Sequence, residues 1–133
     1  HVLAKLMEDE AGTLISGNQL GLEKSRFDFT LENFDREFLM SFAEKVNAVV
    51  EKALPIDKQF MTRAEADKDP QLYTLLKGFP KDIEKVRVVD IEGFDKSACG
   101  GTHLKNTSEI GRMTILKLEN KGAKRRRIVF TLD

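Results

Sequence analysis

The spacing of apolar residues predicts a long amphipathic helix in the first half of the chain. Between residues 34 and 53, apolar side chains recur at steps of mostly three or four, so they share one face of a helix. Asn33 is placed to cap this helix, and Pro55 ends it. The residues of the apolar face are Phe34, Phe38, Phe42, Val46, Val49, Val50 and Ala53. Residues 1–10 show the same spacing and predict the last turns of another helix, which stops near Gly12.

Shorter segments that are rich in β-branched residues, or that alternate between polar and apolar, predict β-strands. They cover residues 14–21 (a strand that runs into a loop), 24–30, 56–61, 86–91, 113–118 and 127–132, with a turn at residues 120–122. Residues 63–68 and 71–77 predict short helices. Because helices and strands are interspersed without a strict β-α-β rhythm, the expected fold class is α+β. We expect a mixed, largely antiparallel sheet packed by the one long helix.

The composition is that of a globular protein. With 133 residues, 41% of them hydrophobic, the chain is expected to form a single domain over residues 1–133. No apolar run approaches the roughly 20 residues that cross a bilayer. One cysteine cannot form an internal disulfide, so a cytoplasmic location is expected. A first residue other than Met suggests a chain that is truncated at its N-terminus.

Two residues with metal-binding side chains stand close together in the second half of the chain. Cys99 and His103 are separated by three residues, and Gly100 and Gly101 between them favour a tightly bent loop. Thiolate and imidazole are ligand types that zinc prefers, but two ligands do not make a site. A lone cysteine is more often a small buried apolar residue. The other histidine, His1, is at the far end of the chain, so spacing alone leaves both interpretations open.

A basic run near the C-terminus is a candidate RNA contact. The formal net charge is zero, so a polyanionic partner would need such a local patch. The residues of this run are Lys121, Lys124, Arg125, Arg126 and Arg127. If a strand begins here, alternate side chains face opposite sides, and only part of the run forms one surface. A solvated face without a partner is the alternative interpretation.

The order of the motifs resembles the second additional domain shared by alanyl-tRNA synthetases, threonyl-tRNA synthetases and the AlaX editing proteins. The resembling blocks are His1-Val2-Leu3, Gln19-Leu20-Gly21, Arg26-Phe27-Asp28-Phe29, Cys99-Gly100-Gly101-Thr102-His103 and Asn106-Thr107-Ser108-Glu109-Ile110-Gly111. Ser108 departs from the family pattern, which has glycine there. The Gly-Gly form of the cysteine motif and residues 122–132 are most similar to the C-terminal editing domain of longer AlaX proteins. The editing domain of a full synthetase is the alternative.

This resemblance implies a zinc site between a helix and the Cys-x-x-x-His loop. His1, Cys99 and His103 would be three of the Zn²⁺ ligands, and the fourth would be a histidine four residues before His1. Gly100 and Gly101 would let a small amino acid approach the ion closely. A site with four protein ligands is formally closed, which favours zinc that anchors the substrate's amino group, or a structural zinc, over zinc that activates a water.

The implied activity is hydrolysis of tRNA(Ala) that carries serine or glycine in place of alanine, with the acceptor end of this tRNA as the partner. Gln19 and Thr30, and more weakly Thr102, are candidate contacts for the amino acid or the ribose. Each of the three could equally be an ordinary polar group of a loop or strand. A tRNA-binding module with structural zinc and no activity is the alternative function.

Overall fold

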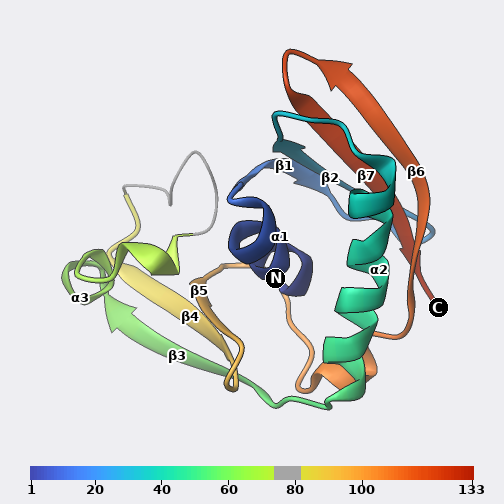
Figure 1. The fold of residues 1–133 in the computed structure, drawn as a ribbon. Helices are drawn as coiled ribbons and strands as arrows, with labels where there is room; N and C mark the ends of the chain where they lie inside the picture. The colour runs from blue at the N-terminus through green and yellow to red at the C-terminus, as the bar shows by residue number, and fades with distance from the viewer. Residues whose placement is uncertain (74–81) are drawn as a thin grey trace.

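The computed structural model describes residues 1–73 and 82–133, which form two sheets with helices packed against them (Figure 1). The helices are α1 (Val2–Ala11), α2 (Arg36–Glu51) and α3 (Arg63–Asp67), with the 3-10 turns η1 (Pro70–Leu72) and η2 (Thr107–Glu109). The strands are β1 (Ile15–Gln19), β2 (Ser25–Thr30), β3 (Ile56–Thr62), β4 (Lys85–Ile91), β5 (Asp95–Ala98), β6 (Met113–Gly122) and β7 (Arg125–Leu132). One sheet has the strand order β1-β2-β7-β6, and the other has the order β3-β4-β5.

Helix α2 starts after a polar cap residue and ends before Pro55, the residue that was expected to end it. The Asp35 carboxylate accepts a hydrogen bond from the backbone N–H of Phe38 at 3.1 Å, which satisfies one of the unpaired donors of the first turn. The cap is therefore Asp35, and the expectation of a cap at Asn33 is wrong by two residues. The helix ends at Glu51 because the chain turns there, with Ala53 at a positive φ of 52°.

The four-stranded sheet, α1 and α2 enclose the larger of two hydrophobic cores (Figure 1). Phe29 from β2, Phe42 from α2 and Ile128 from β7 are completely buried there. Asn47 fastens α2 to the sheet, because its side-chain amide donates to the Met113 carbonyl at 3.0 Å and its oxygen accepts from the Met113 N–H at 2.7 Å. These contacts fix the helix over one face of β6.

The three-stranded sheet has a smaller core on one face and the N-terminus of α1 on the other. The residues of the smaller core are Ala66, Leu72, Val86, Val88 and Ala98. Because neighbouring strand residues face opposite sides, Ser97 points away from this core. The Ser97 hydroxyl lies 3.0 Å from Nδ1 of His1, so the start of α1 sits on this second face.

The structure differs from the sequence-based expectations in three further places. Two separate sheets replace the one expected sheet, and the strand pairs in both are antiparallel. Strand β5 was not expected, because its four residues are too few to show an alternating pattern. The turn of the last hairpin lies at Ala123 and Lys124, which both have positive φ, rather than at residues 120–122.

One further prediction falls mostly outside the described residues. The short helix expected at residues 71–77 overlaps η1 at its start, and residues 74–81 are not described. Among the residues that are described, no helix is long and apolar enough to cross a membrane.

Candidate metal centre

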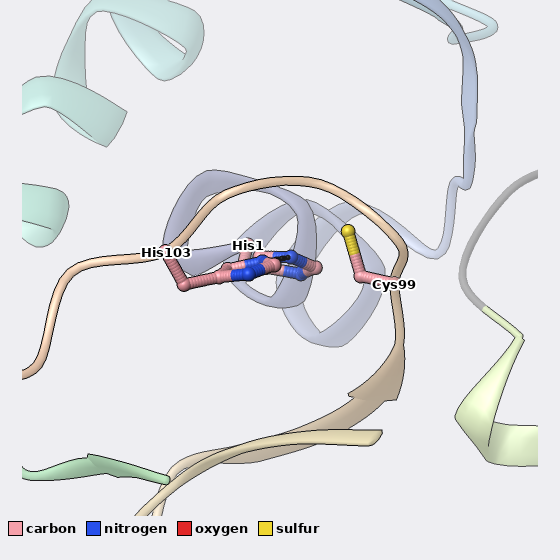
Figure 2. A group of neighbouring side chains, drawn as sticks. All are labelled: His1, Cys99 and His103. Carbon is pink, nitrogen blue, oxygen red and sulfur yellow. Dashed lines mark hydrogen bonds between the residues drawn. The ribbon is translucent and has the colours of Figure 1, made fainter. Parts of the chain in front are cut away.

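The side chain of His1 meets those of Cys99 and His103, although His1 lies 102 positions from His103 in the sequence. His1 precedes α1, Cys99 follows β5, and His103 lies four residues further along the same loop (Figure 2). The Nε2 atoms of the two histidines are 2.7 Å apart, and their ring centroids are 4.8 Å apart. One ligand atom from each of the three residues lies within 4.8 Å of the others. The arrangement could therefore hold a metal ion.

Arg87 on β4 fixes the loop that carries the cysteine. The backbone N–H of Cys99 donates to the Arg87 carbonyl at 3.0 Å, which extends the pairing of β4 and β5 by one residue. In return, Nε of Arg87 donates to the Cys99 carbonyl at 3.1 Å, and its terminal nitrogen donates to the Gly101 carbonyl. The side chain of Arg87 thus holds the loop backbone at two carbonyls, those of Cys99 and Gly101.

The glycines of the loop leave space beside the sulfur. The Gly101 N–H points at Sγ of Cys99, at 3.5 Å. A Cβ atom on residue 101 would lie 3.6 Å from that sulfur, whereas a Cβ on Gly100 would meet nothing within 4 Å. A side chain at position 101 would therefore cover the sulfur, so glycine keeps it accessible.

The surroundings favour the forms of these side chains that bind metals. A hydrogen bond with His1 lowers the pKa of the Cys99 thiol, and the Gly101 N–H and the charge of Arg87 act in the same direction, against burial. Burial lowers the pKa of His103 to about 4, with help from the nearby charges of His1, Arg87 and Lys58. A neutral imidazole and a thiol that ionises readily are the forms required of ligands.

The geometry also fits an ion. Bonds of about 2.0–2.1 Å in a tetrahedral site place two ligand nitrogens about 3.3 Å apart, so the two histidine rings need to separate only slightly from 2.7 Å. His1 has a partner for its other nitrogen in Ser97, as ligating histidines usually do. Within residues 1–73 and 82–133, the buried Nδ1 of His103 has no hydrogen-bond partner. The donor set of two imidazoles and one thiolate is the nitrogen–sulfur type that zinc binds.

The other predicted catalytic residues lie in different places. Gln19 ends β1 opposite Arg26, and it lines a hollow of about 260 Å³ on the four-stranded sheet. Thr30 ends β2, is exposed, and lies opposite Arg125. Thr102 is exposed beside His103 in the cysteine loop. Of the three, only Thr102 is therefore adjacent in sequence to the metal-site residues, and the roles of all three stay predictions.

Two arginines of the basic run already have partners within the chain. Arg126 is 7% exposed, and its guanidinium donates to the Asn120 side chain at 2.6 Å and to the Glu32 carbonyl at 3.1 Å. Arg127 makes two hydrogen bonds to the Asp28 carboxylate, at 2.7 and 3.1 Å. Both side chains are therefore engaged in contacts that stabilise the fold.

The rest of the run is exposed. Lys121 lies 3.2 Å from Glu119, and Lys124 lies 3.0 Å from Glu32, so both charges have a carboxylate beside them. Arg125 is also exposed, at the start of β7. The contact of these residues with RNA remains a prediction.

Sequence reasoning missed the two residues that orient the metal-site side chains. Arg87 stands between the buried residues Val86 and Val88, and a charge at such a position is a signal that its side chain has a specific partner. Ser97 stands two residues before Cys99, where strand alternation places both on one face. That second inference needs β5, which the sequence does not predict.

Comparison with known proteins identifies relatives of this two-sheet domain. Residues 86–129 match the domain family described as the threonyl and alanyl tRNA synthetase second additional domain. The chain is 50% identical over 133 residues to the alanyl-tRNA editing protein AlaX-M of Methanosarcina acetivorans, covering 99% of this chain and 54% of that protein.

Less similar relatives include another AlaX-M protein and an alanine–tRNA ligase. The AlaX-M protein of Saccharolobus solfataricus is 36% identical over 132 residues, 99% of this chain and 55% of that protein. An alanine–tRNA ligase of Methanococcus maripaludis is 36% identical over 105 residues, 78% of this chain and 12% of the ligase. The chain is thus confirmed to resemble the editing domain of alanyl-tRNA synthetases and AlaX proteins. It spans about half the length of the AlaX-M relatives.

Proposed function

We propose that this chain hydrolyses the ester bond between a wrong amino acid and tRNA(Ala), and so removes serine or glycine. The observation that carries the proposal is the convergence of His1, Cys99 and His103, in a chain whose relatives are named alanyl-tRNA editing proteins. In the reaction, a water adds to the ester carbonyl and the bond to the ribose oxygen breaks. The products are the free amino acid and the terminal adenosine with its hydroxyl restored.

The proposed cofactor is Zn²⁺, held by His1, Cys99 and His103. The family resemblance suggests a histidine four residues before His1 as the fourth ligand. When bound, the zinc would supply a Lewis-acid centre for the α-amino group of the substrate. The protein's own part is to keep this donor set in place, through Ser97 on His1 and Arg87 on the cysteine loop.

The need for such a site follows from the limits of a small pocket. A pocket built for alanine rejects an added hydroxyl only about 100-fold and cannot exclude glycine by size. A separate site that forms a hydrogen bond with the serine hydroxyl discriminates more strongly, because alanine leaves that partner unpaired. Thr102, exposed beside His103, is the proposed contact in this loop, and Gly100 and Gly101 leave room for the amino acid. We propose Gln19 and Thr30 as contacts of the ribose or amino acid.

The test combines metal analysis with deacylation, using the full-length protein. The wild type is expected to contain about one zinc per chain and to release serine from Ser-tRNA(Ala) much faster than alanine from Ala-tRNA(Ala). Cys99→Ala and His103→Ala should lose the metal and at least about 100-fold in rate. Ser97→Ala should lose about 10- to 100-fold, the usual cost of removing a partner of a metal ligand. Ser108→Ala, an exposed serine of η2, is the matched control and should behave as the wild type.

The outcomes separate the two functions. Folded wild type that holds zinc but releases no serine would overturn the hydrolase proposal and leave a tRNA-binding module with structural zinc. Equal rates in the wild type and in Cys99→Ala would overturn the role of the metal site.

A further inference from the structure

An exposed aromatic side chain lies on the edge strand of the three-stranded sheet. Phe60 on β3 is 62% exposed. The other seven phenylalanines that the structure describes are buried or half-buried, and Phe79 lies outside the described residues. An exposed aromatic ring on an edge strand offers a flat apolar face on which a partner can stack.

Basic side chains share this face with Phe60. In the register of β3 and β4, Phe60 lies opposite Arg87, and Lys58 and Lys85 occupy positions two residues away on their strands. The Lys85 ammonium lies 5.0 Å from the centre of the Phe60 ring. We call Lys58, Phe60 and Lys85 the Phe60 patch.

No carboxylate neutralises this charge within the register. The eight positions of this face on β3 and β4 are Ile56, Lys58, Phe60, Thr62, Lys85, Arg87, Val89 and Ile91, and none is acidic. On β5, the acidic residue of the same face is Asp95, which lies opposite Ile91 at the far end of the strands from Lys85. The patch therefore has a net positive charge.

The patch adjoins the metal centre across β4. Arg87 lies between Phe60 on β3 and Cys99 after β5, because it pairs with both. Neighbouring strands are about 4.8 Å apart, so the backbones of Phe60 and Cys99 are about 10 Å apart.

We propose that the Phe60 patch binds the single-stranded 3′ end of the tRNA whose ester enters the metal centre. A base stacks on the ring of Phe60, and the phosphates on either side of it lie against Lys58 and Lys85. An aromatic ring flanked by cations is the general way in which proteins hold single-stranded nucleic acid, since every base has a flat face and every linkage a charge. The choice of tRNA as the bound RNA rests on the proposed function. The inference that the patch binds single-stranded nucleic acid rests on its residues alone.

The structure favours this face over the basic β6–β7 hairpin. Arg126 and Arg127 there are used in contacts within the chain, and Lys121 and Lys124 have carboxylates beside them. The hairpin run also has no exposed aromatic side chain for a base, since Phe130 on β7 is buried. The Phe60 patch has both an exposed aromatic ring and basic side chains beside it, the two elements that bind single-stranded nucleic acid.

The experiment measures binding separately from catalysis. The probe is a fluorescently labelled single-stranded RNA that ends in CCA without an amino acid, and its anisotropy gives Kd for the full-length protein. Phe60→Ala should raise Kd by about 5- to 150-fold, the range for losing one base–aromatic stack, and Phe60→Trp should keep the affinity. Lys58→Ala should reduce the slope of log K against log salt by about 0.7. Leu116→Ala, an exposed apolar residue of β6, is the control and should change neither quantity.

A second measurement uses the substrate. With Ser-tRNA(Ala), Phe60→Ala should raise KM by a similar factor and leave kcat within about twofold, because the ring does not touch the reacting atoms. Unchanged Kd and KM in Phe60→Ala would overturn the inference while the deacylase proposal stands. Weaker RNA binding by Phe60→Ala, with no deacylation by the wild type, would overturn only the proposed function. A wild type that is dimeric and a Phe60→Ala variant that is monomeric would identify the patch as a protein interface and overturn the inference.

Discussion

The two sheets use their charged residues in opposite ways. On the four-stranded sheet, Arg126 and Arg127 are adjacent in sequence, yet one is buried among backbone and side-chain acceptors and the other is paired with Asp28. On the three-stranded sheet, Lys58 and Lys85 are distant in sequence. They nevertheless share one face of β3 and β4, and this face carries no carboxylate. A run of basic residues therefore says little about where positive charge gathers. The strand register decides it.

The first prediction compares the two cores. Phe29→Ala removes a completely buried ring from the larger core and should lower the free energy of unfolding by about 3–5 kcal/mol. Val88→Ala, in the smaller core, should cost about 2 kcal/mol, because fewer buried carbon atoms are lost. Urea denaturation followed by circular dichroism measures both.

Metal content sharpens this comparison, because Val88 lies on the strand next to Cys99 whereas Phe29 lies in the other sheet. At low denaturant, folded Phe29→Ala should bind zinc as the wild type does, and Val88→Ala should bind it more weakly. The reverse order would show that the metal centre depends on the four-stranded sheet rather than on β4 and β5.

The sequence predicts these elements better than it predicts their assembly. The helical spacing of apolar residues and the β-branched segments locate α2, β2, β4 and β7 to within a few residues, since local periodicity records which face is buried. Periodicity carries no information on which strands pair. The division into two sheets, and the line Phe60–Arg87–Cys99 across one of them, could not be predicted for that reason.

The candidate metal site shows the same limit. His1, Cys99 and His103 were proposed from motifs that resemble a known family, and the structure brings the three together. Their supports, Ser97 and Arg87, depend on β5 and its register with β4, which only the fold provides.

The second prediction uses pH to test the environment of His103 in metal-free protein. The pKa of His103 is lowered to about 4 by burial and by nearby cations, against about 6.5 in the unfolded chain. Between these values the unfolded state binds more protons, so stability is complete above about pH 6.5 and falls as the pH drops towards 4. His103→Gln cannot take up this proton, so its stability should fall less over the same window.

Urea midpoints at pH 7.0, 5.5 and 4.5, measured in the presence of a chelator, give the comparison. The difference between wild type and His103→Gln isolates this histidine from the carboxylates that titrate in the same range. A difference that does not change with pH would mean that His103 is solvated like a histidine in an unfolded chain. Arg87 and Lys58 would then not act on it, and the link between the metal centre and the cations of β3 and β4 would be lost.

The third prediction has the smallest effect and tests the charge comparison directly. Asp28→Asn with Glu119→Gln removes the two carboxylates beside Arg127, at 2.7 and 3.8 Å. The loss in stability should be small, because solvated ion pairs contribute little to folding. Kd for the labelled CCA-ending RNA should not change at 0.15 M salt, where charges beyond about 8 Å are screened. The double variant also frees Lys117 and Lys121, which lie beside Glu119. If binding instead tightens and the salt slope steepens by about 0.7 or more, the RNA lies along the β6–β7 hairpin. The positive face of the three-stranded sheet would then serve another partner.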